Sequence, residues 1–496
     1  MITKNSRTFV VILTALSILS ILFSSCAIRP TSVPTLSPTA TIVPSETAIP
    51  ATATETVPTL FPAFTLEPGD FYFSIEGKQS FLLSRNVAGN EASHYDRLLD
   101  WTSIGGSKFV RLHLDSFGMG CSKTGKVDGA WARKWESVFD KAASNGMSVI
   151  PVFGVWYDWD TGNDFWKSNP LNEKNGGPVK TPGDLFIPDS PTQELWLQWL
   201  KTLVERWQGQ ENILAWEIFS EVNMVPGATE TQGIYFVNRA ASIIRAADSH
   251  HRPITASLAE NSGWSDFYRS DAIDFINIHP YPVSGELDRE IIAEAHSRLA
   301  EYHKPVMIGE AGLSFRLPDS YPATLTTAER ADIGIKHAIW ASVVSGAMNG
   351  RSLWWEDGVA VYFPSVGWPF LNKYADTELP AAKFVEGIDF SGFEPLTSRS
   401  SGSVFGAVVG NEKIAIGWFR DANCEPPNWP LQPVISKQTV TIVMRGTALN
   451  WRVVFYSTET GTDIIGSTIV TRQGNSITIT FPDFMDDIAF KMNIQE

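Results

Sequence analysis

The chain contains 496 residues, of which 43% are hydrophobic and 19% are charged. This composition excludes an intrinsically disordered protein and provides apolar material for one large core and one smaller core. The 39 Lys and Arg residues face 54 Asp and Glu residues, so the formal net charge is −15 at pH 7. Such a charge repels phosphate backbones and anionic lipid, which argues against nucleic-acid binding and favours a neutral partner.

Residues 1–26 have the pattern of a bacterial export signal. Lys4 and Arg7 precede an apolar run over residues 9–23, which is shorter than a typical membrane span. The five residues that end at Cys26 resemble a lipobox, and they read Leu22-Phe23-Ser24-Ser25-Cys26. The resemblance implies that Cys26 is lipidated and holds the chain at the extracellular face of a membrane. Phe23 is unusual at its position, so ordinary cleavage followed by secretion is the alternative.

Residues 27–69 are predicted to form a disordered linker. Thr, Pro, Ser and Ala dominate this stretch, which therefore cannot build a core. Proline keeps such a chain extended at about 3.1 Å per residue, so the linker can hold a folded part up to ~120 Å from its anchor.

Residues 70–392 are predicted to form a (β/α)8 barrel, which is an α/β fold of the TIM type. Eight short apolar runs alternate with stretches that are apolar at helical spacing, as expected for a parallel sheet covered by helices. The runs are Phe81–Val87, Phe109–Leu114, Ser148–Phe153, Ile213–Phe219, Ile254–Leu258, Phe275–His279, Pro305–Gly309 and Arg351–Trp355. The helical stretches include Trp131–Asn145, Glu194–Trp207, Tyr235–Asp248, Ile291–Tyr302 and Ala328–Val344. A doubly wound open sheet is the alternative, but no Gly-rich nucleotide fingerprint follows the first run.

Residues 393–496 are predicted to form an antiparallel β-sandwich domain. Apolar residues recur there with a period of two, for example over Thr439–Met444, Trp451–Tyr456 and Ser476–Phe481. This domain either binds carbohydrate or packs against the barrel. We favour packing, because its last strand, Ile488–Met492, runs almost to the end of the chain.

Two glutamates directly follow apolar runs of the predicted barrel. Glu221 comes after the fourth run and Glu310 after the seventh, so both side chains lie at the carboxyl ends of strands, where barrels carry their reactive groups. Glycoside cleavage with retention needs two carboxylates about 5–5.5 Å apart, one to attack the anomeric carbon and one to protonate the leaving oxygen. We interpret Glu221 and Glu310 as such a catalytic pair rather than as two solvated loop glutamates.

The surroundings of both glutamates resemble glycoside hydrolase clan A, the barrel enzymes that include cellulase-like and mannanase-like members of family five. In that clan the acid/base follows strand 4 in a Trp-Glu-x-x-Asn-Glu pattern, and the nucleophile follows strand 7 in an x-x-Gly-Glu pattern. This chain reads Trp216-Glu217-Ile218-Phe219-Ser220-Glu221 and Met307-Ile308-Gly309-Glu310. The resemblance implies that Glu221 is the acid/base, that Glu310 is the nucleophile and that the reaction retains anomeric configuration.

Further positions agree with this resemblance. Arg111 closes the second run, where the clan has an arginine that keeps the nucleophile ionised. His279 and Tyr281 follow the sixth run, where the clan has residues that line the site. Trp354 and Trp355 close the eighth run, where the clan has a platform that stacks on sugar, and strand alternation lets only one of them face the mouth.

Ser220 is where the chain departs from the clan. The clan has Asn at this position, which binds the 2-hydroxyl of the central sugar, and serine is shorter. Because contacts to the 2-hydroxyl contribute several kcal/mol in the transition state, this change affects the expected substrate. Three interpretations follow: compensation by a neighbour such as Asn223, a different sugar, or a weakened enzyme.

A large insertion is predicted between Gly154 and Ser190, and it carries aromatic residues suited to sugar subsites. Trp156 is the first of them, and the others are Tyr157, Trp159 and Trp166, with Trp264 and Trp368 as weaker candidates elsewhere in the chain. Alternating Asp158, Asp160 and Asp164 are reminiscent of a calcium loop, but the glutamate that would close it is missing.

We therefore predict a retaining glycoside hydrolase that cleaves β-linked polysaccharide or oligosaccharide outside the cell. No Cys or His cluster has zinc spacing, so we expect no metal and no cofactor. Cys121 and Cys424 fall in different predicted domains and are either a disulfide or two unconnected thiols. We expect a monomer that meets the membrane only through its lipid anchor. The alternatives are a surface carbohydrate-binding protein on a degenerate hydrolase barrel and a surface module that uses the barrel as a scaffold.

Overall fold

The computed structural model describes residues 64–87, 95–259, 263–312, 331–351, 376–426 and 429–495. Within these ranges, no helix is both long enough and apolar enough to cross a membrane. The predicted signal peptide, the lipidation site Cys26 and nearly all of the predicted linker lie outside the described residues, so they stay predictions.

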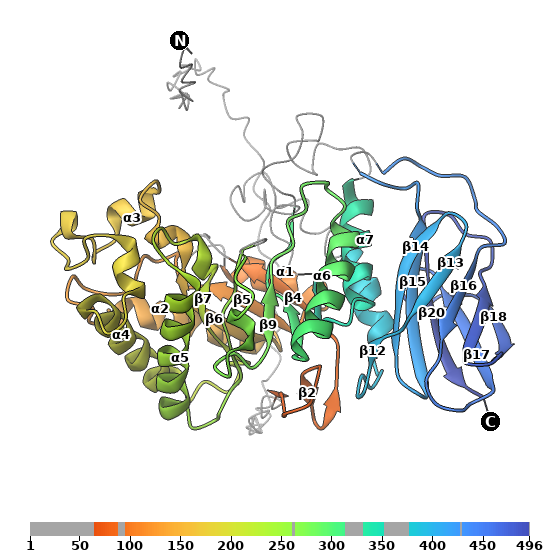
Figure 1. The fold of residues 1–496 in the computed structure, drawn as a ribbon, viewed down its shortest axis with the longest axis horizontal. Helices are drawn as coiled ribbons and strands as arrows, with labels where there is room; N and C mark the ends of the chain where they lie inside the picture. Colours follow the sequence, from red (N-terminus) through yellow and green to blue (C-terminus); the bar gives the residue numbers. More distant parts are fainter. Residues whose placement is uncertain are drawn as a thin grey trace, which may run out of the picture. The chain divides into compact units, whose positions relative to one another are not determined.

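Eight parallel strands form a closed barrel (Figure 1). They are β4 (Leu82–Val87), β5 (Phe109–His113), β6 (Ser148–Val155), β7 (Trp216–Ser220), β8 (Ile254–Thr255), β9 (Ile276–Ile278), β10 (Val306–Ile308) and β11 (Asn349–Arg351). Six of them hydrogen-bond in the order β11-β4-β5-β6-β7-β8, and β9 pairs with β10. A parallel bridge between Ser257 and Asn277 joins the two groups on one side, and Met348 donates to the Val306 carbonyl at 2.8 Å on the other. The predicted (β/α)8 barrel is confirmed.

Helices cover the outside of this barrel. They are α1 (Tyr95–Ile104), α2 (Gly129–Ser144), α4 (Pro191–Trp207), α5 (Glu230–Ala247), α6 (Leu287–Tyr302), α7 (Ala331–Val343) and a helix over residues 376–385. Asp128 and Ser190 cap the N-termini of α2 and α4 by accepting backbone N–H bonds. Between β8 and β9 the described residues contain only the short 3-10 turn η6 (Phe267–Arg269), whose Phe267 and Tyr268 are buried.

The eighth strand begins at Asn349, two residues before the predicted start at Arg351. Asn349 is fully buried, and its side chain bonds both the N–H and the carbonyl of Ile308, at 2.7 and 2.8 Å. The Asn349 side chain thus makes the hydrogen bonds that a neighbouring strand's backbone would otherwise make. Because Asn349 is polar, a hydrophobicity pattern does not identify it as part of a strand. The predicted continuation to Trp355 lies outside the described residues.

A small antiparallel sheet precedes the first barrel strand. It consists of β1 (Phe64–Thr65), β2 (Ser74–Ile75) and β3 (Lys78–Gln79). Phe73 is fully buried beside it, with its ring centroid 6.4 Å from that of Phe109 and 5.9 Å from that of Phe275, at the amino ends of two barrel strands. The predicted linker end at residue 69 falls inside this sheet, because Phe64 and Leu66 already pack against the barrel core.

Two antiparallel sheets follow the barrel and form the predicted β-sandwich. The larger has the order β12 (Glu394–Pro395), β14 (Val404–Gly410), β15 (Ile414–Asp421), β20 (Asp487–Ile494), β17 (Asn450–Tyr456) and β18 (Ile464–Thr471). The smaller contains β13 (Ser398–Ser401), β16 (Thr439–Val443) and β19 (Ser476–Thr480). Their facing side chains, such as Val453, Phe490, Ile442 and Ile479, form a second core. The exact domain boundaries stay predictions.

The outer face of the larger sheet belongs to the core of the barrel. Alternate residues of β14 and β15, including Val409, Ile416 and Trp418, cluster with the buried barrel residues. Arg420 of β15 forms a buried ion pair with Asp288 of α6 at 2.5 Å. The sheet domain packs against the barrel, and no aromatic side chain of its described residues is exposed. Neither Cys121 nor Cys424 forms a disulfide, so the two cysteines are not joined to each other.

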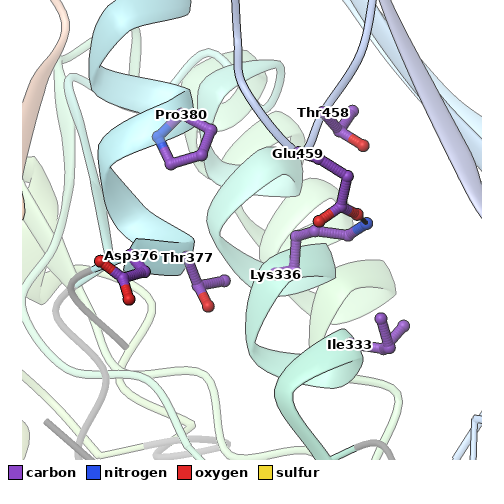
Figure 2. Close-up of a pocket in the computed structure, with 7 residues that line it drawn as sticks. All are labelled: Ile333, Lys336, Asp376, Thr377, Pro380, Thr458 and Glu459. Carbon is purple, nitrogen blue, oxygen red and sulfur yellow. Dashed lines mark hydrogen bonds and ion pairs between the residues drawn. The ribbon is translucent and has the colours of Figure 1, made fainter. Parts of the chain in front are cut away.

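Lys336 of α7 anchors this junction through two ion pairs. Its Nζ lies 2.6 Å from Glu459, in the loop between β17 and β18 (Figure 2). It also lies 2.8 Å from Asp487 of β20. The Lys336 side chain is only 6% exposed and that of Asp487 only 1%. Burial alone would lower the pKa of Lys336, but Asp487 and Glu459 raise it above its ordinary value, so the lysine stays charged.

Lys336→Met is expected to lower the free energy of unfolding by about 3 kcal/mol, because it leaves the Asp487 charge buried without its cation. Urea unfolding followed by fluorescence measures this change. Lys201→Met is the matched control, since Lys201 and its partner Glu205 are 45% and 48% exposed and their pair contributes less than about 1 kcal/mol. Equal small effects in both variants would contradict the prediction.

Candidate active site

The carboxyl ends of the barrel strands bring the predicted site residues together. Arg111 comes from β5, Glu221 follows β7, His279 follows β9 and Glu310 follows β10. All four are at least nine-tenths buried. A Glu221 oxygen, a His279 ring nitrogen and a Glu310 oxygen lie within 4.8 Å of one another. The two glutamates thus meet across the mouth of the barrel, as their positions in the sequence predict.

Glu310 is surrounded by hydrogen-bond donors. Arg111 Nη1 donates to its Oε1 at 2.8 Å, and the Tyr281 hydroxyl donates to its Oε2 at 2.9 Å. Burial alone would raise the pKa of Glu310, but the charges of His279 and Arg111 outweigh it and hold the pKa well below its ordinary range. Glu310 is therefore an ionised carboxylate at neutral pH.

Arg111 is held in place by a second carboxylate, Glu217. Its Nε and Nη2 donate to the two Glu217 oxygens at 2.6 Å each, in a fork that fixes the plane of the guanidinium. Glu217 also accepts from Asn277 Nδ2 at 3.0 Å and from the Ser257 hydroxyl at 3.3 Å. No role is predicted from the sequence for Glu217, Asn277 or Ser257. For Glu217 a signal exists, because it is a charged residue in the middle of an apolar run.

Glu221 has an unusual backbone conformation. Its φ of 59° and ψ of 54° lie in the left-handed region, which non-glycine residues adopt rarely. The residue is 9% exposed, and its Oε1 lies 2.9 Å from Nδ1 of His279. A left-handed residue at the end of a strand reverses the direction in which its side chain would otherwise point. Such a backbone conformation is strained, and strained residues are often found at functional sites.

His279 lies between the two carboxylates. The same Nδ1 that contacts Glu221 lies 3.7 Å from Glu310 Oε2, and the ring is fully buried. Burial lowers the pKa of His279, but the negative charges of Glu310 and Glu221 raise it overall. The raised pKa favours a protonated ring, whose Nδ1 donates a hydrogen bond to Glu221 and lies at ion-pair distance from Glu310. Its Nε2 has no hydrogen-bond partner among the described residues.

Ser220 points to Arg111 and Glu310. Its hydroxyl accepts from Arg111 Nη2 at 2.9 Å and lies 3.5 Å from Glu310 Oε1. With 1% exposure it sits behind the carboxylate. Compensation by Asn223 is not favoured, because its side-chain oxygen accepts from the Ala259 backbone at 2.7 Å.

The insertion after β6 contains the short helices η2 (Trp156–Trp159) and α3 (Asp164–Ser168). Trp156 is half-buried at the start of the insertion. Trp159 and Trp166 are not at the surface: they are 0% and 5% exposed with ring centroids 5.8 Å apart, so the expectation that they form subsites is wrong. Both rings instead belong to the hydrophobic core that the insertion shares with the barrel.

Tyr157 links the insertion to the site. Its hydroxyl lies 3.0 Å from Nδ1 of His113, and it donates a short bond to Asp115. Nε2 of His113 lies 2.8 Å from Arg111 and 3.4 Å from Glu310. An arginine only donates, so His113 Nε2 accepts from it and Nδ1 carries the ring proton. His113 and Asp115 have no role in the prediction from the sequence.

Two aspartates of the insertion bind neighbouring residues of the same loop. Asp160 accepts from the Gly162 N–H at 3.0 Å, and Asp164 pairs with Lys167 at 2.6 Å. Among the described residues, the one group with the spacing of a metal site is Glu221, His279 and Glu310. There the Arg111 guanidinium already balances the Glu310 charge. Trp264 is half-buried against Phe267, whereas Trp354, Trp355 and Trp368 lie outside the described residues.

Fold and site together define a (β/α)8 barrel with a β-sandwich, whose strand ends hold a buried pair of carboxylates around an arginine and a histidine. No family model and no curated protein matches the chain. Among solved structures, one named "Glycoside hydrolase" shares the fold with a TM-score of 0.58 at 12% identity, over 88% of this chain and 97% of the other. The GH30 endoxylanase of Clostridium papyrosolvens C71 gives a TM-score of 0.47 at 14% identity, over 84% and 97% of the two chains. The fold implied by the resemblance to clan A is confirmed.

Proposed function

We propose that the protein is a retaining glycoside hydrolase in which Glu310 is the nucleophile and Glu221 the acid/base. One observation carries the proposal: oxygens of the two carboxylates lie within 4.8 Å of each other, and Arg111 holds Glu310 ionised from 2.8 Å. Retaining enzymes need carboxyl groups about 5–5.5 Å apart, whereas inverting enzymes need roughly 6.5–9.5 Å to admit a water. The shared fold with a glycoside hydrolase supports the same reaction class.

The reaction proceeds in two displacements. Glu310 attacks the anomeric carbon and forms an ester while Glu221 gives its proton to the departing oxygen. Glu221 then takes a proton from water, which attacks the same carbon and releases Glu310. In the first step negative charge leaves Glu310 and arises on Glu221. His279, at 3.7 Å from one and 2.9 Å from the other, stabilises both states without moving.

The substrate is a β-linked polysaccharide or oligosaccharide outside the cell. The half-buried Trp156 and the exposed Phe165 offer aromatic faces on the insertion beside the site. Phe165 is 47% exposed, and its ring centroid lies 5.3 Å from that of Tyr157 in a tilted arrangement. Lipidation at Cys26 would hold the enzyme at the extracellular face of the membrane, and the linker would let it reach a polymer. The carboxylates, Arg111 and His279 supply the chemistry, so no cofactor is needed.

Product stereochemistry tests the proposal. The full chain is incubated with a panel of β-linked glucans, mannans, xylans and aryl glycosides, and the first anomer released is identified by proton NMR. The β-anomer is expected, because two displacements restore the original configuration. Release of the α-anomer, or no release from any member of the panel, would reject the assignment.

A carbohydrate-binding protein without turnover is the second candidate, and Ser220 favours it. The serine hydroxyl is engaged with Arg111 and lies close to Glu310, so it is not placed to contact a sugar hydroxyl that strengthens the transition state. Calorimetric titration with the oligosaccharides of the same panel separates the two candidates. Tight binding with no product over days supports the binding protein.

Tyr281→Phe is expected to move the acid limb of the kcat/KM profile to higher pH. The pKa of Glu310 is lowered, so the active ionised form persists below the ordinary glutamate pKa of about 4.3 and is lost as the pH falls through the folded-state pKa. Removing the hydroxyl that donates to Glu310 raises this pKa, and we expect the limb to rise by about one pH unit. Tyr302→Phe, which removes a hydroxyl bonded to the Ser265 carbonyl away from the site, should leave the profile unchanged.

A further inference from the structure

The ladder between β7 and β8 slips at Glu221. The pairing of Trp216 with Ile254 and of Glu217 with Thr255 would give the Ser257 N–H the Ile218 carbonyl as its acceptor. It donates instead to the Phe219 carbonyl at 3.0 Å, so the pairing has already moved on by one residue there. The next regular bond would run from the Glu221 N–H to the Ser257 carbonyl. Instead, the Val222 N–H donates to that carbonyl at 3.1 Å. The left-handed Glu221 thus lies where the pairing moves on by one further residue.

The slip leaves the N–H of Glu221 without a backbone acceptor. The Ser257 hydroxyl accepts it at 3.0 Å. A buried N–H without a partner is costly, and a short side-chain oxygen next to the backbone replaces the missing carbonyl. One serine therefore supplies both acceptors, its carbonyl for Val222 and its hydroxyl for Glu221.

The same hydroxyl also reaches the network around Glu310. It donates to Glu217 Oε1 at 3.3 Å, and that oxygen accepts from Arg111 Nη2 at 2.6 Å. Arg111 in turn donates to Glu310. Ser257 is fully buried, so it acts through these neighbours and not by touching a substrate.

We propose that Ser257 is the positioning residue of the acid/base: its hydroxyl holds Glu221 in the left-handed conformation that aims its carboxylate at His279 and Glu310. The inference rests on the proposed function. The side chain of Ser220 points into the barrel mouth. Successive side chains of a regular strand point to opposite faces, so a regular Glu221 would point away from the mouth. Without the Ser257 hydroxyl, the regular ladder is the conformation that satisfies the Glu221 N–H.

Ser257→Ala tests this role through the dependence on the leaving group. A displaced acid slows the departure of an alcohol, which needs a proton, but not the departure of dinitrophenolate, which leaves unprotonated. We expect kcat/KM to fall by roughly 30-fold or more on an oligosaccharide and by less than about 3-fold on the matching dinitrophenyl glycoside. Ser84→Ala is the matched control, since Ser84 is a fully buried strand serine bonded to the Gly350 carbonyl.

The outcomes are separable. Equal losses on both substrates would mean that Ser257 acts on Glu310 through Glu217 and Arg111, which overturns the proposed role. A loss no larger than that of Ser84→Ala also overturns it. An unsubstituted protein that turns over neither substrate rejects the proposed function and the inference together. To separate a folding defect from misplacement, the melting temperature of each variant is measured, and a leaving-group difference at an unchanged melting temperature supports the inference.

Discussion

Glu310→Gln is expected to lower turnover by at least ~10⁴-fold on every substrate, including those with activated leaving groups. The amide has nearly the same shape as the carboxylate and still accepts a bond from Arg111, but its oxygen is too weak a nucleophile to attack the anomeric carbon. The loss must therefore be in kcat and independent of the leaving group. Initial rates on an oligosaccharide and on a dinitrophenyl glycoside measure it.

Glu205→Gln provides the control for this change. Glu205 is half exposed on α4 and pairs with Lys201, so its variant should keep full activity. Glu310→Gln should still fold, although the loss of the charge facing Arg111 is expected to lower its melting temperature. A Glu310→Gln protein with unchanged rates would mean that another group attacks the sugar.

Glu221→Ala is expected to have a different pattern of loss. Turnover of an oligosaccharide should fall by about 10²–10⁴-fold, because the leaving alcohol is no longer protonated. A dinitrophenyl glycoside should still react with Glu310, but water then attacks the ester slowly without a base. A covalent glycosyl ester should accumulate, and intact-protein mass spectrometry detects it as one added sugar unit.

The position of the added sugar is decisive in this experiment. Peptide mapping should locate it on Glu310, and Glu221→Ala combined with Glu310→Gln should show none. Azide, which attacks without a general base, should restore turnover of the activated substrate as a glycosyl azide. Failure to accumulate any ester, together with an oligosaccharide rate equal to that of Glu205→Ala, would remove Glu221 from the mechanism.

The barrel was predictable because its strands are short apolar runs separated by helical stretches of regular length. Each of the eight runs overlaps an observed strand, the eighth only at Arg351. The polar residues at the ends of these strands, such as Arg111, Glu221 and Glu310, converge because parallel strands end at one edge. Errors of boundary have a common cause. Where a side chain takes over a backbone bond, as at Asn349 and Ser257, the hydrophobic pattern does not report the strand correctly.

The supporting residues of the site were not predictable in the same way. Asn277 and Ser257 are short polar residues inside apolar runs, and one chain alone does not show that both converge on Glu217 from neighbouring strands. The prediction of sugar subsites from the aromatic residues of the insertion was wrong for the opposite reason. Trp159 and Trp166 lie on a loop, where stacking on sugar is a natural expectation, but both are buried in the hydrophobic core that the loop shares with the barrel.

The way in which β14 and β15 pack has a consequence for engineering. Trp418 and Ile416 belong to the core of the barrel, while their strand neighbours Ala415 and Phe419 belong to the core between the sheets. The two faces of the larger sheet therefore contribute to two different hydrophobic cores. A fragment cut after the last barrel helix would expose the apolar surface that β14 and β15 now cover. The C-terminal sheets therefore cannot be exchanged between enzymes as an independent domain.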